Sequence, residues 1–101
     1  MKIAVAGAGA FGTALAIALR ASGRDVALWG RQSEAMDALL ETRISPHLPG
    51  VTLPKELPVS ANIDTVLQAD VILLAVPAQA LDGFLGHYGK ALADERLAIV
   101  A

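Results

Sequence analysis

The sequence predicts an α/β fold, in which a mainly parallel β-sheet carries helices on both faces. Segments with strand-like and helix-like patterns alternate along the 101 residues, as is typical of this class. The runs 2–6 and 71–76 are almost wholly apolar, as expected of strands that a parallel sheet buries on both sides. Apolar residues make up 54% of the chain and aromatic residues only 4%, so the core must consist mainly of Val, Ile, Leu and Ala.

The first apolar run leads directly into a glycine motif. Residues 3–12 read IAVAGAGAFG, in which Gly7, Gly9 and Gly12 fit the pattern G-x-G-x-x-G. In a dinucleotide-binding turn, the first glycine allows the sharp bend, the second the close approach of a pyrophosphate, and the third the packing of the next helix. The pyrophosphate would bind at the N-terminus of a helix over 10–21. We therefore predict a Rossmann-type domain, in an incomplete (truncated) form.

Gly23 is expected to end the first helix, and the second strand is predicted over Asp25–Trp29. The residues at the end of this strand discriminate between NAD and NADP. An acid there would bind the ribose 2′-hydroxyl of NAD, whereas an arginine nearby would accommodate the 2′-phosphate of NADP. No acid stands at this point, but Arg31 follows it. A charge-assisted bond of about 1.5–3 kcal/mol would give roughly a ten- to hundredfold preference for NADPH. NADP is therefore favoured and NAD is left open; the alternative is that Arg31 is an ordinary solvated arginine.

The next segment predicts a helix followed by a long connection. Ser33 is the expected N-cap of this helix, and Met36, Leu39 and Leu40 form its apolar stripe. Four of the five prolines lie in 44–59, a density that no helix tolerates. We expect an extended surface connection there, with a linker between domains as the alternative.

The remaining elements are short. We expect a strand at 59–60, a brief helix over 63–68 capped by Asn62, an irregular helix after residue 80 because of its three glycines, and a strand over 97–101. Since the chain stops inside that last apolar strand, we expect it to be the front part of a longer protein.

Three loops should meet at one edge of the predicted sheet. The carboxyl ends of parallel strands lie together, and ligands of open α/β sheets bind beside them. These loops are residues 7–12, 30–32 and 77–79. Pro77 ends the strand over 71–76 and could form a wall of the adenosine site, although a simple strand terminator explains it nearly as well.

Composition excludes several classes of partner. The net charge is −2 and the charges are scattered, which argues against nucleic acid and against an anionic membrane surface. The absence of cysteine excludes a disulfide scaffold and a thiolate metal site, and it fits a reducing cytoplasm. A signal peptide over residues 1–19 is the alternative for the N-terminus, but three glycines and Thr13 interrupt its apolar run.

Some conspicuous side chains carry no chemical assignment. His47 and His87 lack the spacing of a metal site, and no local carboxylate cluster completes one. His87 beside Tyr88 does not make an acid–base pair, because no orienting carboxylate accompanies them. Trp29 and Phe84 are single aromatic residues on apolar segments, and we expect both in the core.

At this point the sequence resembles a known family. The segments GAGAFGTALA at 7–16, LWGRQ at 28–32, HLPGVTLP at 47–54 and ILLAVPAQA at 72–80 occur in the right order and spacing. Together they closely resemble the N-terminal domain of bacterial NAD(P)-dependent glycerol-3-phosphate dehydrogenase. The resemblance runs along the full chain, and it is more specific than the glycine motif alone.

The resemblance implies coenzyme contacts at particular positions, namely Ala10, Phe11, Arg31, Gln32 and His47. Three of these positions depart from the residues common in the family. Ser is usual where Ala10 stands, and its absence removes one phosphate hydrogen bond worth roughly 0.5–1.5 kcal/mol. Trp or Tyr is usual at Phe11, and Tyr is common at His47. Without the resemblance, His47 would be interpreted as an exposed loop histidine.

The resemblance also implies an activity for the whole enzyme. This is reversible hydride transfer between NAD(P)H and dihydroxyacetone phosphate, a small phosphorylated substrate, which gives sn-glycerol 3-phosphate for phospholipid synthesis. The family's catalytic lysine lies just beyond the last strand, and its substrate residues lie in a C-terminal helical domain. We therefore expect residues 1–101 to bind coenzyme without turnover, with no catalytic residue of their own, and we leave a homodimer open.

Two other functions are compatible with this sequence. One is a different nicotinamide reductase with a similar front end, such as a ketopantoate reductase-like or opine dehydrogenase-like enzyme. The other is a non-catalytic sensor that binds a dinucleotide and alters a partner interaction. A flavoprotein is disfavoured, because an acid for the ribose would be expected where Arg31 stands.

Overall fold

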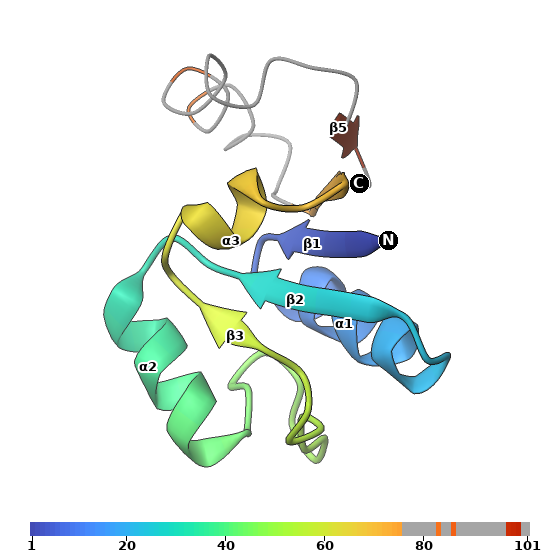
Figure 1. Ribbon diagram of the computed structural model, residues 1–101. Helices are drawn as coiled ribbons and strands as arrows, with labels where there is room; N and C mark the ends of the chain where they lie inside the picture. The colour runs from blue at the N-terminus through green and yellow to red at the C-terminus, as the bar shows by residue number, and fades with distance from the viewer. Residues whose placement is uncertain (76–82, 84–85, 87–96, 100–101) are drawn as a thin grey trace.

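The computed structural model describes residues 1–75, 83, 86 and 97–99, and its elements alternate between strand and helix over residues 2–74 (Figure 1). Their order is β1 (Lys2–Ala6), α1 (Ala10–Ala21), β2 (Asp25–Trp29), α2 (Ser33–Thr42), β3 (Val59–Ser60), α3 (Asp64–Leu67), β4 (Val71–Leu74) and β5 (Leu97–Ile99). This alternation confirms the predicted α/β class.

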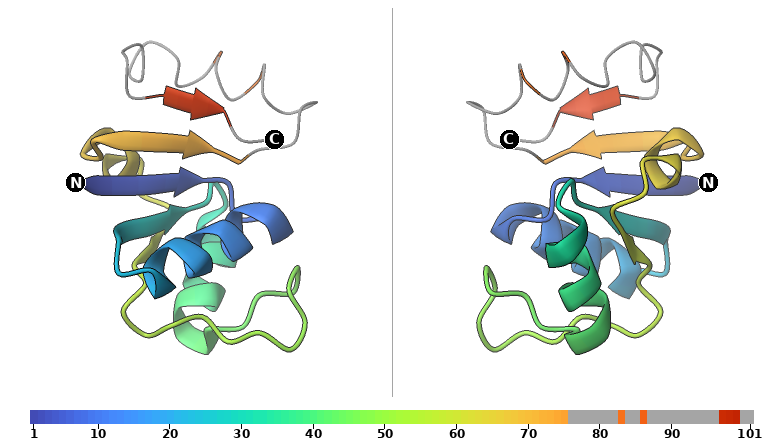
Figure 2. Two further views of the ribbon diagram at one scale, coloured as in Figure 1. Left: turned by 90° about the vertical axis from the view of Figure 1, so that its right-hand side faces the viewer. Right: turned by 90° about the vertical axis from the view of Figure 1, so that its left-hand side faces the viewer.

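In the described part of the chain, the strands form one five-stranded sheet in the order β3-β2-β1-β4-β5. All four pairings are parallel, and Figure 2 shows the strand arrows of β1, β4 and β5 pointing the same way. Strand β1 lies in the centre, where Ile3 is in register with Val26 of β2 and with Val71 of β4. The almost wholly apolar sequence of β1 is explained by this position, because the strand is covered on both faces.

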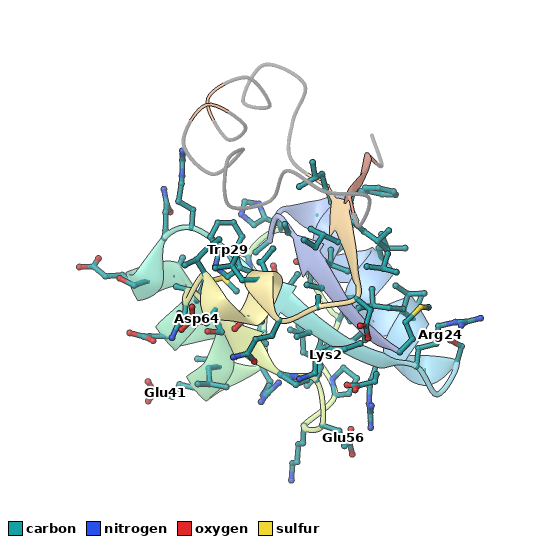
Figure 3. All side chains as sticks on the ribbon, turned by 45° about the horizontal axis from the view of Figure 1, so that its top comes forward. Lys2, Arg24, Trp29, Glu41, Glu56 and Asp64 are labelled. Carbon is teal, nitrogen blue, oxygen red and sulfur yellow. The ribbon has the colours of Figure 1, made fainter. Side chains whose placement is uncertain are left out.

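Helices cover both faces of the sheet. On one face, α1 and α2 pack against side chains of β1 and β2, with Ala16 and Met36 among the buried residues. On the other face, Val66 of α3 packs with Trp29 and with alternate residues of β1 and β4. Figure 1 shows α3 and α1 on opposite sides of the strands, and Figure 3 shows Trp29 beside α3. The prediction of helices on both faces is confirmed, as is the core position of Trp29.

Several predicted boundaries are confirmed and two details are wrong. Helix α1 spans the predicted residues, and Gly23 follows it with a φ of 86°. Ser33 is not the N-cap of α2: Gln32 occupies that position, and Ser33 is the first helical residue. Leu40 does not belong to the buried stripe, since it is 47% exposed while Met36 and Leu39 are buried. Leu40 lies one position beyond Leu39, so the helix turns it toward solvent.

The segment between α2 and β3 contains no helix, as predicted, but it is not only a surface connection. Leu53 and Leu57 are 2% and 0% exposed and belong to the core beneath α2. Arg43 connects the segment to α2, because its Nη1 donates to the carbonyl oxygens of Pro54 at 3.1 Å and Leu57 at 2.6 Å. The prolines exclude a helix, but Leu53 and Leu57 still pack into the same core cluster as Met36 and Leu39 of α2.

The later elements agree with prediction apart from their ends. Helix α3 is one residue shorter at each end than predicted, so its N-cap is Ile63 and not Asn62. The Oδ1 atom of Asn62 nevertheless accepts the N–H of Asp64 at 3.0 Å. Strand β4 ends at Leu74 instead of residue 76. The predictions for Pro77, Phe84, His87 and Tyr88 lie outside the described residues, and of the helix predicted after residue 80 only Gly83 and Gly86 are described, both helical.

Candidate functional site

The glycine loop lies at the carboxyl edge of the sheet, between the ends of three strands. Gly7 leaves β1 with a φ of 129°, a conformation that other residues rarely adopt, and its N–H donates to the carbonyl of Trp29 at 2.8 Å. On the other side of β1, the N–H of Ala75 donates to the carbonyl of Ala6 at 2.9 Å, just after β4. The loop is therefore tied to both neighbours of the central strand, at the point where the strand order reverses.

Two glycines permit close packing around this loop. A Cβ on Gly12 would collide with the carbonyl group of Gly7 and would lie 3.2 Å from the Cβ of Ala75. A Cβ on Gly30, just after β2, would collide with the Sδ of Met36 and lie 3.1 Å from the Cβ of Ala8. The predicted role of Gly12 in packing the helix against the sheet agrees with this contact. The packing role of Gly30 was not predicted, although its place after the second strand was a usable signal.

Gly9 differs from both, because a Cβ there would meet nothing within 4 Å. It is the N-cap of α1, where no side chain makes a capping hydrogen bond and the first turn contains no acid. Ala10 and Phe11, the next two residues, are exposed, Phe11 by 50%. The first N–H groups of a helix have no partner within it, and the helix dipole places partial positive charge there. This end of α1 can therefore accept an anion that approaches the backbone of Gly9 closely.

Thr13 supports the loop from within the protein, and the sequence reasoning did not assign it a role. It is fully buried, and its Oγ1 donates to the carbonyl of Ala8 at 3.2 Å. Its backbone N–H donates to the carbonyl of Gly9 at 3.0 Å. Threonine in an apolar helix was the available signal, but its hydrogen-bond partner could not be inferred from sequence.

Arg31 and Gln32 are exposed and follow β2 at the same carboxyl edge as the glycine loop. Asp25 starts β2 opposite Lys2 and so lies at the other edge, as predicted. In the described residues from β2 onward, the first acid after Arg31 in the sequence is Glu34, in the first turn of α2. The electrostatic setting is that of an arginine available to an anion.

His47 is exposed and lines a pocket of about 140 Å³, to which Ala8 of the glycine loop also contributes. The rest of the lining comes from one side of α2 and from residues 44–46. The N–H of His47 donates to Oγ of buried Ser45 at 3.1 Å, which fixes the turn. The structure thus brings His47 next to the glycine loop, although Ala8 precedes it by 39 residues in the sequence. Arg31 and Gln32 do not line this pocket, and Pro77 lies outside the described residues.

Other kinds of site have no support in the described part of the chain. Residues 1–75, 83, 86 and 97–99 contain no group of three or more His, Cys, Asp or Glu side chains placed to hold a metal ion. Over the same residues, no helix combines the length and apolar character needed to cross a membrane. Figure 3 shows the labelled charged side chains of Arg24, Glu41 and Glu56 at separate parts of the molecule's outline.

Comparison with known proteins identifies the family. A model of the family described as the N-terminus of NAD-dependent glycerol-3-phosphate dehydrogenase matches residues 2–101. The chain belongs to this family. The NAD(P)+ glycerol-3-phosphate dehydrogenases of Paracoccus denitrificans (strain Pd 1222) and Bradyrhizobium diazoefficiens are 49% and 44% identical to it over 89 and 82 residues. These matches cover 88% and 81% of this chain but 26% and 25% of the two relatives, so the chain spans about a quarter of their length.

Solved structures agree with this membership in the glycerol-3-phosphate dehydrogenase family. The crystal structure of glycerol-3-phosphate dehydrogenase from Coxiella burnetii matches with a TM-score of 0.83 and 30% identity, over 97% of this chain and 30% of that one. A protein from Enterococcus faecalis assigned as a 2-dehydropantoate 2-reductase matches with a TM-score of 0.67 and 28% identity, over 98% of this chain and 32% of that one. The Rossmann-type fold is confirmed, and both matches again cover under a third of the longer protein.

Proposed function

We propose that this chain is the coenzyme-binding part of a longer NAD(P)-dependent glycerol-3-phosphate dehydrogenase. The observation that carries the proposal is made at Gly9. This residue is the N-cap of α1 without a side-chain capping bond, and a Cβ on it would meet nothing within 4 Å. The surrounding loop is held at both neighbouring strands, so its N–H groups are placed before a ligand arrives. A pyrophosphate needs this arrangement of donors and close backbone approach.

The coenzyme would extend from the glycine loop over the carboxyl edge of the sheet. Its pyrophosphate would lie on the N–H groups around Gly9, Ala10 and Phe11, and its adenosine ribose near Arg31 and Gln32. Pro77 remains predicted as a wall of the adenosine site. His47 would contact the coenzyme from the pocket beside Ala8.

Arg31 supports a preference for NADPH over NADH. A guanidinium binds phosphate through two parallel hydrogen bonds, and the described residues place no carboxylate at the end of β2 to select the 2′-hydroxyl of NAD instead. We infer a preference of about tenfold or more, with NAD as the weaker ligand.

The proposed reaction of the whole protein is hydride transfer between NAD(P)H and dihydroxyacetone phosphate. The reduced coenzyme would supply the hydride, and this chain would bind and orient it. The name glycerol-3-phosphate dehydrogenase, which the relatives carry, supports this substrate pair. Because the chain spans about a quarter of the relatives' length, we assign substrate binding to the remainder of the longer protein. A cytoplasmic role in phospholipid synthesis and a homodimeric assembly belong to the same proposal. A 2-dehydropantoate 2-reductase is the second candidate, because the Enterococcus faecalis protein assigned to that activity also matches this chain. Its TM-score of 0.67 is lower than the 0.83 of the glycerol-3-phosphate dehydrogenase, which is therefore preferred.

Calorimetric titration with NADPH and NADH tests the coenzyme assignment. The purified chain should bind NADPH at least tenfold more tightly than NADH, and Arg31→Ala should abolish the difference by weakening NADPH alone. Arg24→Ala is the matched control, because Arg24 is exposed and lies at the opposite end of β2. Equal binding of both coenzymes to the unmodified chain would contradict the role of Arg31. Failure to bind either coenzyme would contradict the proposed site.

A further inference from the structure

Thr13 makes an unusual hydrogen bond beneath the glycine loop. A threonine within a helix commonly bonds the carbonyl four residues earlier, which here is Gly9. The Thr13 hydroxyl instead donates to Ala8, five residues earlier and outside the helix, at 3.2 Å. The Gly9 carbonyl is bound by the backbone N–H of Thr13 at 3.0 Å. One fully buried residue therefore holds two successive carbonyl groups of the loop.

The bond to Ala8 determines which way the following N–H points. Peptide groups are planar, and none of the described peptide bonds is cis. In a trans peptide, the carbonyl of one residue and the N–H of the next point in opposite directions. Because the Ala8 carbonyl points inward to Thr13, the Gly9 N–H points outward from the protein. Gly9 is exposed there, and a Cβ on it would meet nothing within 4 Å.

We propose that Thr13 is a positioning residue for the coenzyme pyrophosphate, which acts by directing the Gly9 N–H toward it. This inference rests on the proposed function and adds to it a residue that the glycine motif does not include. Without the Thr13 hydroxyl, the Ala8–Gly9 peptide could rotate, and the donor would be aligned only part of the time. The cost would fall on binding of the pyrophosphate and not on the adenosine end of the ligand.

Thr13→Val tests the proposal, since valine keeps the shape of threonine and lacks the hydroxyl. NADPH affinity should fall about tenfold, whereas affinity for adenosine 2′-monophosphate, which has no pyrophosphate, should stay unchanged. Thr13→Ser should restore NADPH affinity. Ser22→Ala is the matched control, because the Ser22 hydroxyl donates to Leu19 at 2.7 Å at the opposite end of α1, away from the loop.

Each outcome has a distinct meaning. Equal loss of NADPH and adenosine 2′-monophosphate would overturn the proposal, because Thr13 would then serve the whole fold. Unchanged NADPH binding in Thr13→Val would overturn it as well. If the unmodified chain binds no NADPH, the proposed function itself fails, which is distinguishable from failure of the Thr13 variant alone.

A measurement on the unmodified chain covers the case in which Thr13→Val does not fold. In ¹⁵N NMR spectra, the Gly9 amide proton should move downfield when NADPH is added, because it acquires a phosphate acceptor. Adenosine 2′-monophosphate should leave that signal in place. An unmoved Gly9 signal at saturating NADPH would overturn the proposal.

Discussion

Within six residues of one loop, the three glycines differ in whether the structure itself requires glycine. Gly7 adopts a φ of 129°, which side chains disfavour. Gly12 lies against the Gly7 carbonyl, so the protein itself excludes a Cβ there. Gly9 has a φ of −74° and an empty Cβ direction, so neither conformation nor packing requires glycine. An open Cβ direction at Gly9 fits the proposed close approach of a pyrophosphate.

This contrast gives a prediction for two alanine variants. Gly12→Ala should destabilise the chain by about 3 kcal/mol or more, because the methyl group meets backbone that cannot move aside. Gly9→Ala should change the free energy of unfolding by at most about 1 kcal/mol. It should nevertheless weaken NADPH binding at least tenfold, since the methyl group occupies the place of the pyrophosphate. Urea unfolding and calorimetry measure the two effects. Wild-type affinity in Gly9→Ala would show that the pyrophosphate does not approach Gly9.

At the scale of elements, Arg43 determines how the proline-rich segment packs. It follows α2 as the C-cap with a φ of 59°, and its carbonyl accepts the N–H of Leu53 at 2.7 Å. Its guanidinium bonds two further carbonyls of the segment, those of Pro54 and Leu57. These bonds bring Leu53 and Leu57 into the core and close the loop that contains His47.

Arg43→Ala should destabilise the chain by about 1–3 kcal/mol, because two partly buried carbonyls lose their donor. Arg43→Gly should be less destabilising than Arg43→Ala by about 1 kcal/mol, since glycine accepts the positive φ. Urea unfolding monitored by circular dichroism gives both values. Arg24→Ala, a change at an exposed arginine, should stay within about 0.5 kcal/mol of the unmodified chain. If Arg43→Ala matched that control, the guanidinium bonds would contribute nothing measurable.

These elements also show which features the sequence could predict. Strands β1 and β2 and helix α1 were predictable because their signals are local: apolar runs, helical spacing and glycines at fixed positions. Prolines could show that 44–59 is not helical, but not that Leu53 and Leu57 are buried, because that depends on α2 and the sheet. The left-handed Arg43 and the Thr13 bond were also unpredictable, since neither uses the residue or partner that local rules favour.

At the scale of the whole molecule, the glycine loop follows the central strand β1, which has β2 and β3 on one side and β4 and β5 on the other. The chain proceeds from β1 to β2 and β3 on one side, then crosses through α3 to β4 on the other. Both neighbours of β1 are bonded to its carboxyl end, so the loop's geometry depends on the packing of the entire sheet. A ligand that binds this loop should therefore stabilise the whole fold, because only the folded chain assembles its donors.

This reasoning predicts coenzyme binding without turnover by residues 1–101. NADPH at about 100 times its dissociation constant should stabilise the chain by about 2.7 kcal/mol, which raises Tm by about 10 °C or more for a domain of this size. NADH at the same concentration should raise Tm less, because it lacks the phosphate proposed to pair with Arg31. With dihydroxyacetone phosphate present, absorbance at the NADPH band should stay constant, since substrate binding is proposed to need the rest of the protein.

The two measurements separate the two parts of this prediction. An unchanged Tm would contradict coenzyme binding by the loop, whatever the absorbance shows. A raised Tm together with steady NADPH oxidation would contradict the division of labour, because the reacting groups would then lie within residues 1–101. Gly9→Ala serves as the matched control, since it should fold normally and lose about half or more of the NADPH-dependent rise in Tm. That loss would link the thermal effect to the glycine loop at the carboxyl end of the central strand.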